Sequence, residues 1–105
     1  MDINLIRKKW LKGQAEITGH ARKRMNSRNI TIEEITQVIL EGEILESYPD
    51  DKPFPSGLIM GKIRNNEPLY VVCSLGEDKV HVITTHWLDP LKWLDPKTRR
   101  EKNHV

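Results

Sequence analysis

The sequence contains few of the features that mark secreted or membrane-spanning proteins. Cys73 is the single cysteine among 105 residues, so no disulfide can form within the chain. No apolar run is long enough to span a bilayer, and residues 1–4 lack the pattern of a signal peptide. We therefore expect a cytoplasmic protein.

The sequence also lacks the common catalytic motifs. It contains no Gly-rich phosphate loop, no paired-carboxylate pattern and no nucleophile elbow. His20, Cys73 and His86 show no spacing typical of metal ligands, so we expect no metal and no cofactor. Cys73 alternates with Val71 and Leu75, which is typical of a small core residue.

Neither sign of charge dominates the chain. Its 17 basic and 15 acidic residues leave a net charge of +2, too small to indicate nucleic-acid binding by itself. The length and the 37% hydrophobic content fit one folded domain with a modest core. We expect a single α+β domain over residues 1–96, followed by a charged, frayed tail over 97–105.

Apolar spacing and capping residues predict three helices in the first part of the chain. The first spans about residues 3–12 with Asp2 as its N-cap, and the second runs from a cap at Thr18 to about Arg28. Thr31 and Glu34 form the capping-box pattern of the third helix, which Gly42 closes. Residues 15–18 are expected to be a short extended piece.

After Gly42 the pattern changes to strands, over residues 43–48, 58–63, 69–75 and 80–85. Three prolines exclude regular structure from residues 49–56, and Asn65-Asn66 suits a tight turn. Short connections predict a four-stranded antiparallel meander with the three N-terminal helices packed on one face. Regular alternation places His86 on the face of Val80 and Val82, and His81 on the opposite face.

The face of the sheet without helices needs a cover, because the last two strands are apolar at successive positions. The cover is the C-terminal tail, a second copy in a homodimer, or a partner. Residues 87–90 and 93–96 both read Trp-Leu-Asp-Pro, and we expect both tryptophans to cover the sheet edge.

The strongest functional signal is a basic stripe formed by His20, Arg24 and Arg28, which share one face of the second helix at about 100° per residue. Two guanidinium groups can clamp a phosphate, and His20 can transfer a proton near neutral pH. The alternative is a solvated basic face that Glu33, Glu34 or Asp50 balances.

An ordered set of short fragments resembles the domain-of-unknown-function family 4258, over roughly residues 3–100. The fragments are residues 17–21 (Ile-Thr-Gly-His-Ala), Arg24, Met25, Arg28, Ile30, Thr31, Glu33, Glu34, and then residues 42–44, 48–51, 68–72, 82–84, 89–90 and 92–93. This chain has His86 where the family usually has tyrosine, so His86 either replaces that residue in proton transfer or marks an altered site.

The resemblance implies a fold and a function. The family is similar to the RelE/ParE/BrnT-like toxins, which have a small antiparallel sheet with helices against it. These relatives include toxins of type II toxin–antitoxin pairs that act as metal-independent endoribonucleases on mRNA, in some cases on the ribosome. Some family members are encoded beside YgiT-type zinc-finger proteins, which would be the antitoxins.

On this reading the site residues are His20, Arg24, Arg28 and His86. The two histidines would serve as base or acid, and the two arginines would hold the phosphate. Lys92 would add a second cation, and Trp93 would stack on a base. The alternative function is a non-enzymatic module of the same fold that binds RNA, phosphate or a protein.

Overall fold

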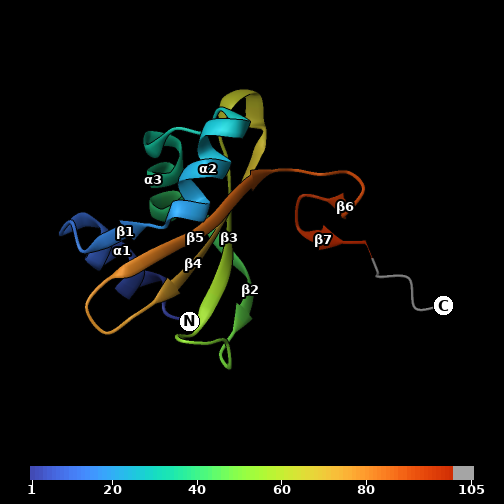
Figure 1. The fold of residues 1–105 in the computed structure, drawn as a ribbon. Helices are drawn as coiled ribbons and strands as arrows, with labels where there is room; N and C mark the ends of the chain where they lie inside the picture. Colours follow the sequence, from blue (N-terminus) through green and yellow to red (C-terminus); the bar gives the residue numbers. More distant parts are fainter. Residues whose placement is uncertain (101–105) are drawn as a thin grey trace.

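The computed structural model describes residues 1–100, which form three helices and two sheets (Figure 1). The helices are α1 (Ile3–Leu11), α2 (Gly19–Arg28) and α3 (Ile32–Glu41), and none of them is long and apolar enough to cross a bilayer. The strands of the main sheet are β1 (Ala15–Ile17), β2 (Glu43–Tyr48), β3 (Ser56–Lys62), β4 (Pro68–Leu75) and β5 (Val80–Trp87). A short 3₁₀ turn, η1 (Arg64–Asn66), joins β3 to β4, and β6 (Trp93–Asp95) pairs with β7 (Thr98–Arg99) in a C-terminal hairpin.

The helices begin and end where the capping residues predict. Asp2 accepts hydrogen bonds from the amides of Asn4 and Leu5, and Thr18 accepts one from the amide of Ala21. Both reciprocal bonds of the Thr31–Glu34 capping box are present. Local side-chain chemistry therefore determines where α1, α2 and α3 begin.

The prediction of a four-stranded antiparallel meander was wrong. The main sheet has five strands in the order β1-β5-β4-β3-β2, and β1 runs parallel to β5 while the other neighbours are antiparallel. The extended piece before α2 supplies the additional strand, with Ala15 opposite Val80 and Ile17 opposite Val82. Three residues are too few to show a strand period, so sequence patterning gave no reason to place them in the sheet.

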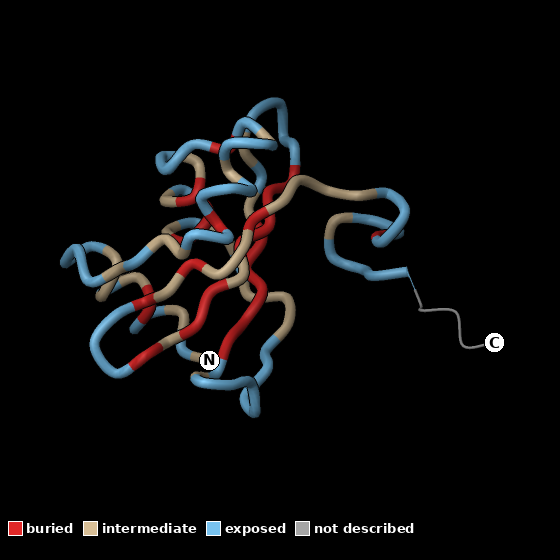
Figure 2. Tube along the Cα trace, viewed as in Figure 1, coloured by how far each residue is buried: buried red, intermediate tan, exposed pale blue. Residues whose placement is uncertain are grey.

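The helices cover one face of the sheet and enclose the main core (Figure 2). The core contains residues from all three helices and from alternate positions of β3, β4 and β5, as period-two alternation requires. Cys73 belongs to this core, and burial raises the pKa of its thiol to about 12. The prediction that Cys73 is a core residue is confirmed.

The opposite face of the sheet, called here the open face, is partly covered by the C-terminal hairpin. The Trp93 indole is 2% exposed and packs with Leu58, Met60 and Tyr70 in a second apolar cluster. The Tyr70 hydroxyl donates to the carbonyl of Pro96 at 2.7 Å. The expectation that the tail covers this face is thus met at Trp93, whereas Trp87 packs against the core on the helix side.

The first residues of the predicted tail take part in this cover. Ion pairs join Lys97 to Glu43 (2.8 Å) and Arg99 to Glu46 (2.5 Å), so two charges of the hairpin attach to β2. Arg99 hydrogen bonds lower the pKa of the Glu46 carboxyl. The rest of the predicted tail, residues 101–105, lies outside the described residues.

A β-bulge changes which side chains of β5 share a face. The register of β4 and β5 slips at Ile83, which has no partner in β4. His81 lies opposite Ser74 and His86 opposite Tyr70, four positions apart on β4, so both histidines point to the open face. The prediction that they occupy opposite faces was wrong, because it assumed unbroken alternation.

Replacing Trp93 by alanine should lower the free energy of unfolding by about 3 kcal/mol, since a buried indole and its packing on Tyr70 are lost. The matched control is Leu94→Ala in the same strand, where a side chain that is 59% exposed should change stability by less than about 0.5 kcal/mol. Urea unfolding followed by circular dichroism measures both. Equal effects of the two variants would contradict the packing of the hairpin on the sheet.

Candidate functional site

Two reciprocal hydrogen bonds join the end of α2 to β5. The Arg28 guanidinium donates to the carbonyl of Thr85 at 2.8 Å, and the Trp87 indole donates to the carbonyl of Arg28 at 2.8 Å. These bonds place the cationic end of the helix directly beside His86, which lies between the two bonded residues of β5. The basic stripe therefore runs toward β5, not away from it.

The other two members of the stripe are exposed at the start and middle of α2. Arg24 Nε donates to His20 Nε2 at 3.4 Å, so the two side chains lie together on the helix surface. Among residues 1–100, no carboxylate forms an ion pair with His20, Arg24 or Arg28.

None of the acidic residues that were expected to balance the stripe forms an ion pair with it within residues 1–100. Glu34 closes the capping box of α3 and pairs with Arg64 at 2.6 Å. Glu33 and Asp50 form no ion pair within the described part of the chain. The stripe therefore presents its positive charge to solvent, where an anion can approach it.

His86 forms one end of a stack on the open face. Its imidazole lies parallel to the Tyr70 ring, with 5.1 Å between ring centroids and 9° between planes. Tyr70 packs in turn on Trp93 at 4.7 Å, and the Arg99 guanidinium lies 4.6 Å from the Trp93 ring centre. The stack thus joins β5 and β4 to the C-terminal hairpin.

Burial and surrounding positive charge keep His86 neutral. Desolvation is the largest cause, followed by the charges of Arg28, Lys92 and Arg99, and together they lower the pKa of His86 to about 4. Asp89 opposes the shift to a smaller extent. At neutral pH the site therefore combines an uncharged imidazole, which can accept a proton, with cations from three separate segments.

The remaining predicted site residues lie in the C-terminal hairpin. Lys92 is exposed just before β6, where its charge acts on His86. The Trp93 indole is buried against Tyr70 and Arg99, and its Nε1 has no hydrogen-bond partner within residues 1–100. A base could stack on Trp93 only after the hairpin moves from the sheet.

Sequence reasoning missed two residues of this site, Tyr70 and Arg99. Tyr70 alternates with the core residues Leu69 and Val71, a pattern that already indicated a second covered face. Arg99 gave no signal, because it belongs to a run of basic residues in the predicted tail.

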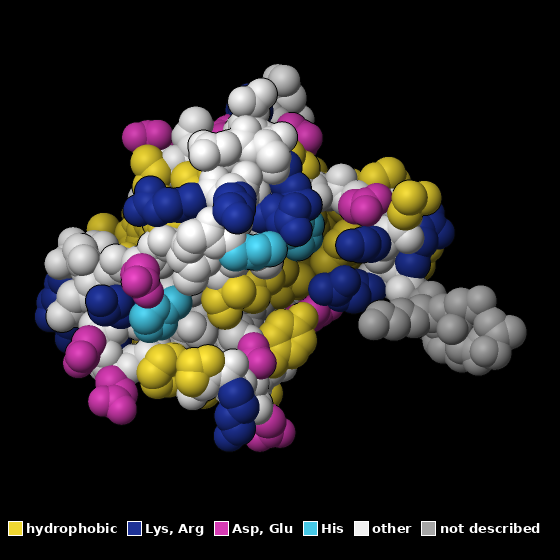
Figure 3. Space-filling model, in the orientation of Figure 1, with side chains coloured by type: hydrophobic (Ala, Val, Ile, Leu, Met, Phe, Trp, Pro, Cys, Tyr) yellow, Lys and Arg dark blue, Asp and Glu magenta, His cyan; other side chains and the backbone are white. Residues whose placement is uncertain are grey.

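The surface view shows the charge arrangement directly. Lys and Arg side chains form a row over α2 and gather again over the C-terminal hairpin (Figure 3). One patch of His atoms lies beside these groups, and another lies apart from them at the lower left of the view. This distribution suits an extended anion that crosses from the helix to the hairpin.

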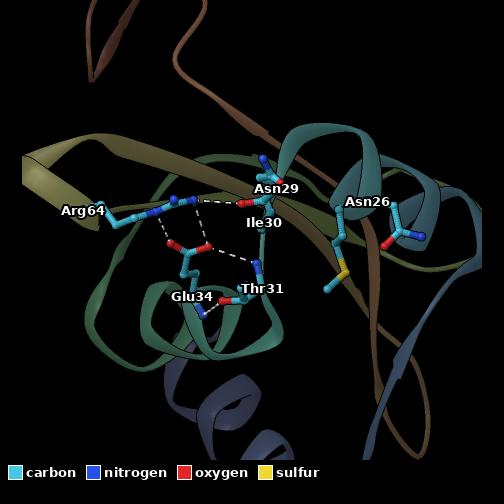
Figure 4. A pocket seen from close by; sticks show the side chains of 7 residues that line it. Asn26, Asn29, Ile30, Thr31, Glu34 and Arg64 are labelled. Carbon is cyan, nitrogen blue, oxygen red and sulfur yellow. Dashed lines mark hydrogen bonds and ion pairs between the residues drawn. The ribbon is translucent and has the colours of Figure 1, made fainter.

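A separate open pocket of about 480 Å³ lies at the end of α2 and is lined by Met25, Asn26, Asn29, Ile30, Thr31, Glu34 and Arg64 (Figure 4). The side chains of Thr31, Glu34 and Arg64 in this pocket are already used by the fold. Glu34 bonds to Thr31 and Arg64, and Arg64 also donates to the carbonyl of Asn29 at 2.8 Å. We attribute a structural role to these contacts, which tie α2, α3 and η1 together.

Residues 1–100 contain no cluster of three or more His, Cys, Asp or Glu side chains arranged to hold a metal ion. Cys73 lies in the helix-side core, whereas His86 points to the open face, so these two side chains do not meet. The side chains at the site can transfer a proton at histidine and stabilise negative charge at arginine and lysine.

Comparison with known proteins identifies one family. The family described as "Domain of unknown function (DUF4258)" matches residues 17–87, which include α2, α3 and β2 to β5. Lys92, Trp93 and Arg99 lie outside the matched region. No curated protein and no solved structure shows a significant match.

The low pKa of His86 predicts a pH-dependent stability. The unfolded chain binds this proton near pH 6.5 and the folded chain only near pH 4, so stability should fall as pH is lowered through that window. The shift corresponds to about 3 kcal/mol, and solvent screening of a partly exposed ring reduces the expected loss to about 1–2 kcal/mol.

The His86→Phe variant keeps the stack on Tyr70 but removes the titrating group. Urea unfolding at pH 7 and at pH 4.5 should therefore show a smaller loss of stability for His86→Phe than for the unaltered chain. Identical losses in both proteins would mean that His86 titrates normally and is not surrounded by cations.

Proposed function

The chain belongs to the DUF4258 family, and we propose that it is the toxin of a type II toxin–antitoxin pair, an endoribonuclease that cleaves mRNA in the cytoplasm without a metal ion. The observation that carries this proposal is the neutral His86 surrounded by Arg28, Lys92 and Arg99, next to a stripe that no carboxylate of residues 1–100 neutralises.

RNA would bind through its phosphates. Arg24 and Arg28 offer guanidinium groups, which match phosphate oxygens in pairs and stay charged at every relevant pH. Lys92 offers a further cation, whose charge acts on His86. A phosphate between α2 and the hairpin would relieve the repulsion among these charges, which supports binding at this place rather than elsewhere on the chain.

The reaction needs only groups that the chain supplies. His86 takes the proton from a ribose 2′-hydroxyl, and the 2′-oxygen forms a bond to the adjacent phosphorus. The bond from phosphorus to the 5′-oxygen breaks, which leaves a 2′,3′-cyclic phosphate and a 5′-hydroxyl end. His20 is our candidate to give a proton to the leaving 5′-oxygen, and the arginines stabilise the pentavalent phosphorane.

Substrate binding would also raise the pKa of the base, His86. A bound phosphate brings negative charge close to His86 and offsets the cations that lower its pKa, so the imidazole becomes a stronger base when RNA is present. The depressed pKa of the free site is therefore compatible with catalysis near neutral pH.

An antitoxin would cover this site in the cell. The exposed cations of α2 favour a partner with acidic side chains, and the YgiT-type zinc-finger proteins that accompany some family members are the candidates. Covering α2 and the hairpin together would block both phosphate access and His86.

The direct test is cleavage of single-stranded RNA oligonucleotides by the pure protein in EDTA. The protein should produce 2′,3′-cyclic phosphate ends, either alone in EDTA or, in a separate assay with Mg²⁺, on translating ribosomes. His86→Phe should lower the cleavage rate at least about 100-fold because the base is lost. His86→Tyr restores the residue usual in the family and should keep more activity than His86→Phe. Arg24→Gln should weaken binding, whereas Lys8→Gln, an exposed position on α1, is the matched control.

Several outcomes would overturn this proposal. Absence of cleavage by the pure protein and on ribosomes, together with absence of growth arrest when the chain is expressed alone, would contradict a toxin. Salt-sensitive RNA binding without product would instead identify a non-enzymatic binding module, the alternative function of the same fold. In that case Arg24→Gln would weaken binding and His20→Ala would have little effect.

A further inference from the structure

A second hollow lies on the open face, at the other end of β5 from His86. It measures about 310 Å³ and is lined by Thr18, Lys52, Pro53, Phe54, Ser74, His81 and Ile83. One wall is the loop between β2 and β3, and the floor is formed by open-face side chains of β4 and β5. Its lining is mostly apolar, unlike the cationic surroundings of His86.

Two parallel rings form an aromatic platform in this pocket. Phe54 and His81 lie with 2° between their planes and 5.8 Å between their centroids. His81 Nδ1 lies 2.7 Å from the Glu16 carboxylate on β1, which fixes the orientation of the imidazole. A Cβ atom at position 76 would lie 2.9 Å from His81 Nε2, so the glycine at this position leaves room for the imidazole.

Besides the His81 ring, polar side chains line the pocket at Thr18, Ser74 and Lys52. The Thr18 hydroxyl is already used, since it accepts from the amide of Ala21 and donates to the carbonyl of Ile83. Ser74 is 6% exposed and brings a hydroxyl to an otherwise apolar floor. Lys52 is exposed and supplies a cation at the rim. Planar rings, one buried hydroxyl and one peripheral cation are the groups that recognise a flat heterocycle attached to a phosphate.

We propose that this pocket binds a nucleobase of single-stranded RNA, with the base packed against Phe54 and His81 and its phosphate near Lys52. The inference rests on the proposed function for the identity of the polymer. The bulge at Ile83 places this pocket and the proposed cleavage site on the same face of the sheet, because it brings His81 and His86 to one face of one strand, five residues apart.

The pocket would therefore select the base a few nucleotides from the cleaved bond. Five residues of β5 span roughly 16 Å, a length that a short stretch of extended RNA covers. Phosphates held by Arg28 and Lys92 at one end and by Lys52 at the other would keep the strand on the open face. Base selection and bond cleavage would then be separate tasks at two ends of β5.

The experiment is a titration of the isotopically labelled full chain with AMP, GMP, CMP and UMP, followed by NMR of the Phe54 and His81 side chains. Ribose 5-phosphate is the control ligand, since it keeps the sugar and phosphate but lacks the base. At least one nucleotide should shift both side-chain signals, and Phe54→Leu should weaken that binding about tenfold. Leu11→Ala is the matched control variant, since Leu11 is 71% exposed and does not line the pocket.

The outcomes separate this inference from the proposed function. If RNA is cleaved but no nucleotide shifts Phe54 or His81, the pocket does not bind bases and the inference fails alone. Equal shifts with ribose 5-phosphate would also overturn it, because the site would then recognise only phosphate. If nucleotides bind in the pocket but RNA is not cleaved, the inference stands and the endoribonuclease proposal fails.

Discussion

The contact between Arg28 and β5 fixes the relation between the basic helix and the open face of the sheet. One residue donates from its guanidinium to Thr85 and accepts from Trp87 at its carbonyl, so the end of α2 is held at two points on one strand. These bonds orient Arg28 beside His86, and the stripe continues from there along the surface of α2. Thr18 holds the start of α2 to the same strand, through hydrogen bonds to the carbonyls of Val82 and Ile83.

The open face carries the second half of the site because the sheet needs a cover there. Trp93 supplies the cover and also connects Tyr70 to Arg99, so the hairpin that completes the core brings positive charge close to His86. Packing and electrostatics are therefore coupled in this region. Lys92 and Arg99 of the hairpin add to the lowering of the His86 pKa, and the hairpin is attached to β2 and β4 through Glu46 and the Tyr70 hydroxyl.

The helices could be predicted from neighbouring residues, whereas the sheet topology could not, because it depends on contacts between separate strands. Asp2, Thr18 and Thr31 identified the helix starts because a capping side chain acts within a few residues. The parallel pairing of β1 with β5 joins residues more than 60 positions apart, which no short window contains. The bulge at Ile83 arises in the pairing of β5 with β4, and the alternation along β5 alone does not show it. The sequence showed the basic stripe but did not show whether a carboxylate neutralises it. Only the fold shows that Glu34, one of the candidates, pairs with Arg64 instead.

The central claim is that a phosphate binds among the cations around His86. NMR titration of the His86 imidazole, in the free protein and with a non-cleavable 2′-deoxy dinucleotide, tests this claim most directly. We predict a pKa of about 4 in the free protein and a clearly higher pKa with the dinucleotide, because the phosphate offsets the charges of Arg28, Lys92 and Arg99. An ordinary histidine pKa in the free protein, or a pKa that the dinucleotide leaves unchanged, would contradict it.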